Sequence, residues 1–130
     1  QDRFLRNKIR LRLLPLLEKE YNANIRELLS TTAETVASDY DYLTGAAASA
    51  ARTLGTPVSL KKLLALHPAL RRLFLRQYIA RVKGDTRRID FRHIREIEEM
   101  IIERPAGSRV DLPQGISARK TKQTFRIFRP

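Results

Sequence analysis

The sequence predicts a mainly α-helical protein, a helical bundle with one long helix, closed by a small C-terminal β-hairpin. Three observations lead to this class. Apolar residues recur every three, four or seven positions across residues 25–54. Proline, glycine, serine and asparagine divide the following residues into shorter helical patterns. Only after Gly107 do apolar and polar residues alternate, on either side of the turn signal Pro113-Gln114-Gly115.

The first helix is expected over residues 2–20, with Pro15 either kinking it or marking a restart. At about 100° per residue, arginines share one sector of this helix and aliphatic residues share another. We expect the aliphatic sector to be buried and the arginines to face an anionic partner such as RNA phosphate. The arginines are Arg3, Arg6 and Arg10, and the aliphatic residues are Leu5, Ile9, Leu13 and Leu16.

The long helix is expected to start after a cap at Asn22 or Asn24 and to end at Gly55. We place a domain boundary before it, so that residues 1–22 form a connecting helix and residues 23–130 form a separate domain. The near-heptad spacing of the long helix could also support pairing with a second copy, so a homodimer is one expectation for the oligomeric state.

Three shorter helices are expected next, each beginning at a residue that favours a helix start. Their ranges are 60–66 after Ser59, 68–82 from Pro68, and 91–103 after Asp90. The middle helix is expected to bury Leu70, Leu73 and Phe74, and to carry Arg72, Arg76 and Lys83 on its opposite face. The last helix is expected to bury Ile94, Ile97 and Ile101. Strands at 116–119 and 124–128 would form the hairpin, or a three-stranded element together with the short alternating segment at 108–112.

The charge of the chain is strongly unbalanced, with 26 basic and 14 acidic residues and a formal net charge of +12 in 130 residues. Residues 58–84 contain no acid. This excess indicates a polyanionic partner, with nucleic acid expected first and an anionic membrane surface second. The chain has no Cys and no apolar run long enough to span a membrane, which fits a cytoplasmic protein. Because residue 1 is Gln and lies in a charged helical pattern, we expect a fragment of a longer protein.

The residue patterns that carry catalysis are absent from this sequence. There is no cysteine nucleophile, no G-x-S-x-G elbow and no glycine-rich phosphate loop. His67 and His93 are far apart in the sequence, and neither has a ligand four residues on, so we expect a helix start and a surface position instead of metal ligands. We therefore expect no catalytic residue and no metal site in this chain.

The segments RNKIRLRLLP at residues 6–15, LHPALRR at 66–72 and GSRVDLP at 107–113 together resemble the tRNA(Ile) lysidine synthetase family. The sequence RNKIRLRLLP at residues 6–15 matches the family pattern R-N-x-I-R-x-x-L-L-P. LHPALRR at residues 66–72 is similar to the family's L-P-x-A-L-x-R-R segment, and GSRVDLP at residues 107–113 is similar to its G…LDLPGG hairpin. The departures are Leu11 and Arg12 where the family often has His-Glu, Gln114 for the first glycine of the hairpin, and Thr121 where an aromatic residue is usual.

The resemblance implies a region that follows an ATP-using catalytic domain and helps to hold tRNA(Ile) with a CAU anticodon. There it would present the wobble cytidine for the addition of lysine. ATP and Mg²⁺ would act in the catalytic domain, whose phosphate loop has no counterpart here, so this chain is expected to be inactive alone. The expected partners are therefore tRNA(Ile) and an N-terminal catalytic domain.

Candidate RNA contacts come from the arginine sector, the basic helix face and the basic tail. They are Arg3, Arg6, Asn7, Arg10, Arg72, Arg76, Lys83, Arg119 and Lys120. Arg6 and Asn7 have an alternative role, in which they hold the catalytic domain against this region. Tyr40, Tyr42 and Tyr78 could stack on bases or could be packing groups. The competing functions are a helical protein-interaction module and a general nucleic-acid-binding module without an enzymatic role.

Overall fold

The computed structural model describes the backbone of residues 2–130 and the side chains of residues 4–130. By its internal packing the chain divides into two compact units, Gln1–Asp41 and Tyr42–Pro130. The division falls inside helix α3 (Ile25–Ala51), and the domain boundary expected between residues 22 and 23 stays a prediction. Within residues 2–130, no helix combines the length and the apolar character that crossing a bilayer requires.

The first unit begins with one helical run in three parts. These are α1 (Asp2–Lys8), the π-helical segment η1 (Ile9–Leu13) and α2 (Leu14–Glu20). Leu14 donates its backbone N–H to the carbonyl of Ile9, which makes the turn wider than an α-helical turn. Pro15 follows directly. It has no backbone N–H to donate, and its ring would clash with the preceding turn of a regular α-helix, so a wider turn at this point relieves both problems. The helix expected over residues 2–20 is therefore confirmed, with its irregularity at Pro15.

A short polar turn joins α2 to α3. Arg26 Nε lies 2.7 Å from Glu18 Oε1, and Asn22 Oδ1 accepts the backbone N–H of Asn24 at 2.9 Å. The side chain of Asn22 thus forms a turn that satisfies a backbone donor just before the helix begins at Ile25. The predicted cap at Asn22 or Asn24 stays a prediction.

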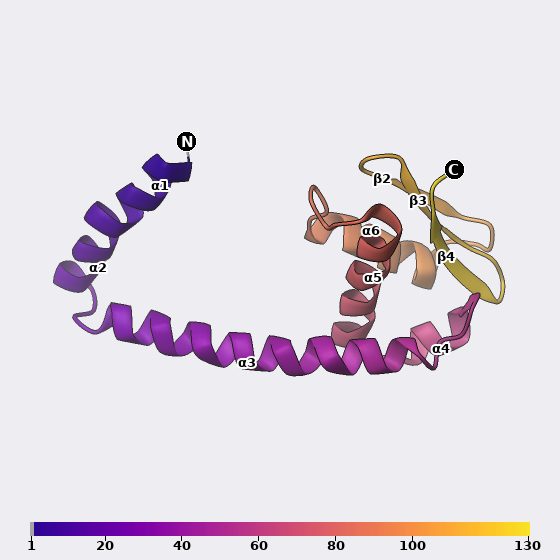
Figure 1. Cartoon of the computed structure of the whole chain (residues 1–130), viewed down its shortest axis with the longest axis horizontal. Coiled ribbons are helices and arrows are strands. Elements are labelled where there is room, and N and C mark those ends of the chain that lie inside the picture. Colours follow the sequence, from indigo (N-terminus) through magenta and orange to yellow (C-terminus); the bar gives the residue numbers. More distant parts are fainter. Residues whose placement is uncertain (1) are drawn as a thin grey trace. The chain divides into compact units, whose positions relative to one another are not determined.

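The second unit contains the end of α3, three further helices and a four-stranded antiparallel sheet (Figure 1). Its elements are β1 (Val58–Ser59), α4 (Leu60–Ala65), α5 (Pro68–Lys83), α6 (Phe91–Glu103), β2 (Arg109–Leu112), β3 (Ile116–Lys120) and β4 (Thr124–Phe128). The strand order is β1-β4-β3-β2. α5 contacts α6 and β4, and α6 contacts β2 and β3, so these helices pack on a sheet.

The chain is mainly α-helical as predicted, but two details of the predicted class need correction. The predicted hairpin is present as β3 and β4, and β2 and β1 extend it to four strands. β1 is only two residues long, too short to show the alternation by which strands are found in a sequence. The helices of the second unit cover this sheet, and they do not form the predicted bundle.

The core of the second unit lies between its helices and the inner face of the sheet. The isoleucine stripe predicted for α6 is fully buried. For α5 the prediction was partly wrong, because Phe74 is buried but Leu70 and Leu73 are only half-buried. Leu75 and Ile79 are fully buried in their place. The reason is that α5 packs on both α6 and β4, which turns a different side of the helix inward.

The starts of α4, α5 and α6 and the end of α5 agree with the sequence signals, whereas α3 ends at Ala51, before the expected Gly55. Ser59 accepts a backbone N–H at the start of α4, and His67 does the same through Nδ1 at the start of α5. Asp90 and His93 form a reciprocal capping box at the start of α6. Gly84 ends α5 with a φ of 101°, a conformation that only glycine adopts without strain. Both histidines therefore have capping roles.

Candidate nucleic-acid interface

The contacts predicted in the first unit are exposed. Arg6 and Asn7 lie on α1, Arg10 lies on η1, and all three residues are exposed. Between the described side chains of this unit, ion pairs form only at Lys19 and Arg26, so no carboxylate among them pairs with Arg6 or Arg10. The side chain of Arg3 lies outside the described residues.

The aliphatic sector of the first helical run lines one apolar groove, together with Lys8 and Arg12. The groove has a volume of about 390 Å³. Its aliphatic residues lie on one side as predicted, but they are not buried within this unit, since their exposed fractions range from 40% for Ile9 to 59% for Leu5. No other described element of the first unit covers this face, so burial of the sector against a further part of the protein stays a prediction.

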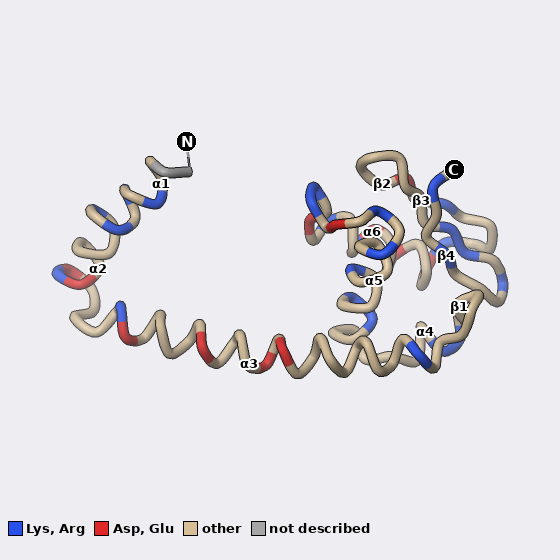
Figure 2. Tube along the Cα trace, viewed as in Figure 1, with Lys and Arg blue, Asp and Glu red and all other residues tan. Residues whose placement is uncertain are grey.

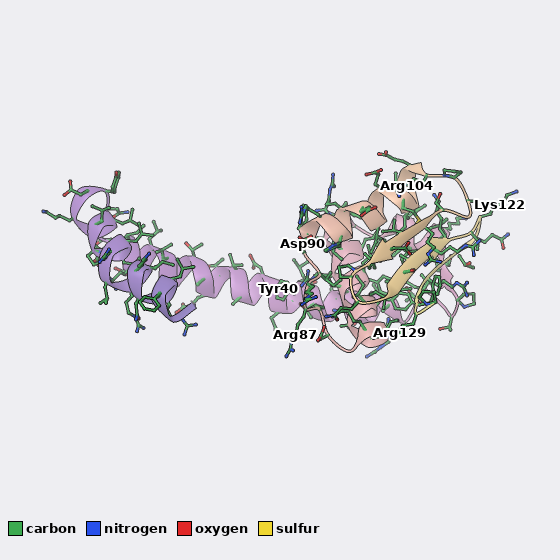
Figure 3. All side chains as sticks on the ribbon, turned by 90° about the horizontal axis from the view of Figure 1, so that it is seen from above. Tyr40, Arg87, Asp90, Arg104, Lys122 and Arg129 are labelled. Atoms are coloured by element: carbon green, nitrogen blue, oxygen red, sulfur yellow. The ribbon has the colours of Figure 1, made fainter. Side chains whose placement is uncertain are left out.

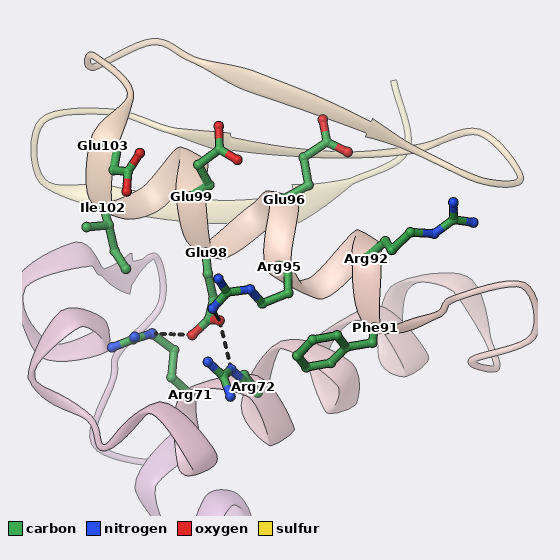
Figure 4. A pocket seen from close by; sticks show the side chains of 10 residues that line it. All are labelled: Arg71, Arg72, Phe91, Arg92, Arg95, Glu96, Glu98, Glu99, Ile102 and Glu103. Carbon is green, nitrogen blue, oxygen red and sulfur yellow. Dashed lines mark hydrogen bonds and ion pairs between the residues drawn. The ribbon is translucent and has the colours of Figure 1, made fainter.

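A buried carboxylate holds the arginines of α5 to α6 (Figure 4). Glu98 is 3% exposed, and its two carboxylate oxygens accept hydrogen bonds from Arg71 Nε at 3.1 Å and from Arg72 Nε at 2.8 Å. Arg71 also donates to the carbonyls of Leu64 and Leu66. The predicted RNA contact Arg72 is thus bound to the protein through Nε, although a third of its side chain remains exposed.

The groove beside this cluster carries balanced charge. Its volume is about 530 Å³, and four arginines and four glutamates contribute to its lining. Figure 4 shows Glu96, Glu99 and Glu103 pointing away from the arginine cluster, and Arg104 pairs with Glu96 and Glu99. Phe91 is exposed here, with Arg72 Cζ 5.7 Å from its ring centroid. Because its charges cancel, this groove is a weaker candidate for an anion site than a surface with unpaired cations.

Two predicted RNA contacts are buried and bind other parts of this chain. The side chain of Lys83 is 1% exposed and pairs with Asp85, and its hydrogen bond lowers the pKa of that carboxyl. Lys120 is 6% exposed, and its Nζ donates to the carbonyl of Ile101 near the end of α6 at 2.8 Å. The prediction for Lys120 was wrong because β3 continues to residue 120. Side chains alternate along a strand, so Lys120 faces the core and Arg119 faces solvent.

The remaining two predicted contacts stay accessible. Arg76 on α5 is partly exposed, and Arg119 on β3 is exposed on the outer face of the sheet. Among the described residues neither of these guanidinium groups forms an ion pair. The register places Arg109 and Arg126 directly beside Arg119 on the neighbouring strands. Sequence reasoning missed these two, although alternation in both strands would have placed them outward.

The tyrosines separate into packing and surface groups. Tyr78 contacts Phe74 and Phe125, with ring centroids 5.7 and 6.2 Å apart, so its packing role is confirmed. Tyr40 and Tyr42 are exposed, and stacking on a base stays a prediction for them.

The net positive charge of the protein lies entirely in the second unit. Residues 42–130 hold 19 Lys and Arg against 7 Asp and Glu, while residues 1–41 hold 7 of each. Figure 2 shows this excess of basic positions around the sheet and α5. Most of the acids in this unit are engaged in ion pairs, which leaves many cations without an acidic partner. Lys122, in the turn between β3 and β4, and Arg129, after β4, are exposed examples (Figure 3).

A mainly helical domain with a small sheet and such an excess of unpaired cations has the features expected of a polyanion-binding module. The model of a known family, described as the TilS substrate binding domain, matches residues 59–124, about half of the chain. The chain belongs to this family.

The sequence is also similar to tRNA(Ile)-lysidine synthases from several bacteria. It is 29% identical to the protein of Clostridioides difficile over 129 residues, which covers 94% of this chain and 28% of that protein. It is 31% identical to the Solibacter usitatus protein, covering 99% of this chain and 30% of the relative. It is 35% identical to the Dehalococcoides mccartyi protein, with coverage of 84% and 24%. The chain thus spans less than a third of the length of these relatives.

Proposed function

We propose that residues 42–130 bind the tRNA substrate of a tRNA(Ile)-lysidine synthase, mainly through its phosphate backbone. The observation that carries this proposal is the concentration of the whole net charge of +12 in this unit. Structured RNA is recognised largely by shape and backbone, and unpaired Arg and Lys side chains supply the phosphate contacts. Membership of the substrate-binding family supports the same conclusion. The predicted contacts that are accessible and unpaired are Arg76 and Arg119.

The finer role we propose is to hold tRNA(Ile) with a CAU anticodon while its wobble cytidine receives lysine elsewhere in the enzyme. ATP and Mg²⁺ would activate the cytidine in the catalytic domain. Among the described residues, no three acidic or histidine side chains are grouped as metal ligands. The chain contributes binding and orientation of the tRNA, and we propose no catalytic residue in it.

For the first unit we propose a different role, as the connection to the catalytic domain. This unit has no net charge and carries the half-exposed apolar groove of α1, η1 and α2. Apolar surface of this kind is typical of a protein contact. The relatives are more than three times as long as this chain, so a large further domain is available to cover it. Arg6, Asn7 and Arg10 would then lie at the junction, facing either that domain or the tRNA.

The experiment that tests the proposed function compares tRNA(Ile) carrying a CAU anticodon with elongator tRNA(Met) across a salt titration. Preference for tRNA(Ile) near 150 mM salt would show that this region reads identity. Equal binding that weakens steeply with salt would show that it supplies electrostatic contacts only. Absence of binding at low salt would contradict the proposal. Concentration-dependent self-association without RNA would favour the alternative of a protein-interaction module that dimerises, for which the long helix is the predicted contact.

A further inference from the structure

The outer face of the sheet carries a row of three arginines on adjacent strands. Arg119 on β3 is the direct partner of Arg109 on β2 and of Arg126 on β4. All three residues are exposed, and their neighbours along each strand, such as Val110 and Ala118, face the core. We call Arg109, Arg119 and Arg126 the arginine row.

Such a row is unfavourable in the absence of a ligand. Like charges directly opposite each other on neighbouring strands repel. Asp111 relieves one end, because its Oδ1 accepts a hydrogen bond from Arg109 Nε at 2.7 Å, and it shares that oxygen with Ser117. The side chain of Arg119, in the centre, forms no hydrogen bond or ion pair with any described residue. The central guanidinium is therefore flanked by cations on both sides and is not compensated within the protein.

An aromatic ring contacts the two outer arginines. Arg126 Cζ lies 4.5 Å from the ring centroid of Phe128, and Arg109 Cζ lies 5.8 Å from the same centroid. Phe128 follows Arg126 by two residues on β4, so both side chains lie on the same face of the sheet. A guanidinium held by the face of a ring keeps its N–H groups at the edge free to donate. Phe128 thus orders two of the three side chains without neutralising their charge.

We propose that the arginine row is a phosphate-binding platform that contacts consecutive phosphates of one strand of the tRNA. The proposal rests on the proposed function and adds a specific site to it, in which Arg109, Arg126 and Phe128 were not among the RNA contacts predicted from the sequence. Neighbouring strands are about 4.8 Å apart, so the row offers three planar donor groups over about 10 Å. Arginine can bind phosphate through two parallel N–H groups, and the register places one guanidinium-bearing residue on each of three adjacent strands.

The test compares Arg119→Gln with Arg88→Gln in the full 130-residue chain. Both variants lose one exposed arginine that forms no ion pair with a described residue, but Arg88 lies in the loop between α5 and α6, away from the row. Loss of a charge-assisted hydrogen bond predicts about tenfold weaker binding of tRNA(Ile) for Arg119→Gln. The slope of log K against log salt should fall by about 1 in magnitude. Arg88→Gln should weaken binding less than about threefold. Equal losses in the two variants would overturn the platform and leave general tRNA binding intact.

A second measurement separates the platform from the proposed function. Inorganic tripolyphosphate should raise the unfolding temperature of the unmodified chain more than that of Arg119→Gln. Without any polyanion, Arg119→Gln should unfold at the same or a higher temperature, because it removes repulsion within the row. If tripolyphosphate binding depends on Arg119 but the chain binds no tRNA, the phosphate site is supported and the proposed tRNA role is refuted. The platform would be refuted if tripolyphosphate raised the unfolding temperatures of the unmodified chain and of Arg119→Gln by the same amount. It would also be refuted if an acidic peptide of matched charge stabilised the unmodified chain as strongly as tripolyphosphate does.

Discussion

The buried carboxylate of Glu98 offers a quantitative test of how the second unit is held together. It joins α6 to α5 through hydrogen bonds from Arg71 and Arg72. The side chain of Arg71 is 9% exposed, so its charge depends on this partner and on two backbone carbonyls. Replacing Glu98 by Ala would leave a buried guanidinium without a counter-charge.

The expected cost follows from the burial of both partners. Removing one member of a buried ion pair typically destabilises a protein by about 3–5 kcal/mol. For a unit of this size, 1 kcal/mol corresponds to about 4–8 °C in the unfolding temperature, so Glu98→Ala should lower it by at least about 12 °C. Glu99→Ala is the matched control on the same helix. Glu99 is half exposed and pairs with Arg104 at the surface, so its loss should cost less than about 1 kcal/mol.

Urea unfolding followed by circular dichroism would measure both variants. A double variant, Arg71→Met with Glu98→Leu, removes the buried charge together with its partner and should recover most of the stability lost in Glu98→Ala. A loss below about 1 kcal/mol for Glu98→Ala would refute the reasoning. A double variant as unstable as Glu98→Ala would show that packing at this position, and not the unpaired charge, causes the loss.

Two further predictions concern groups that the structure places in structural roles. Lys120→Met should destabilise the protein by about 1–3 kcal/mol, because the carbonyl of Ile101 loses its buried donor. The tRNA affinity of the folded protein should change less than about twofold. A large loss of tRNA affinity with unchanged stability in urea would contradict this structural role. The hydrogen bond from Lys83 holds the pKa of Asp85 below its usual 3.8. The ionised carboxylate of Asp85 therefore stabilises the protein at pH values above 3.8, and this stabilisation is lost as the pH falls through the lowered pKa. Asp85→Asn should therefore lose less stability than the unmodified protein between about pH 5 and pH 2, as measured by urea unfolding, and an equal loss would exclude this carboxylate as a source of acid sensitivity.

Local signals predicted the elements well where a single residue type decides the backbone. Gly84, Asp90 and Ser59 each end or begin a helix in the way that their chemistry favours. Packing between elements was harder to predict. β1 exists because Val58 and Ser59 meet Phe125 and Thr124, which are more than sixty residues away in the sequence. The inward side of α5 depends on its contact with β4, and no local periodicity contains that information.

The same distinction explains the outcome for the candidate site. Composition predicted a polyanion partner, but it could not show which cations are free. Lys83 and Lys120 look like surface cations in the sequence, and both are buried against Asp85 and a helix carbonyl. The arginine row was missed for the opposite reason, because its members come from three strands and only the register brings them together.

The central claim is that the second unit binds structured RNA through its unpaired cations. The most direct measurement is the affinity of the 130-residue chain for tRNA(Ile) and for a duplex DNA of similar charge, each titrated from about 50 to 200 mM salt. The account predicts tighter binding to the tRNA at every salt concentration, with a steep loss of affinity as salt rises. Equal affinity for the two polymers would reduce the protein to a general nucleic-acid binder, and no binding to either at low salt would contradict the account.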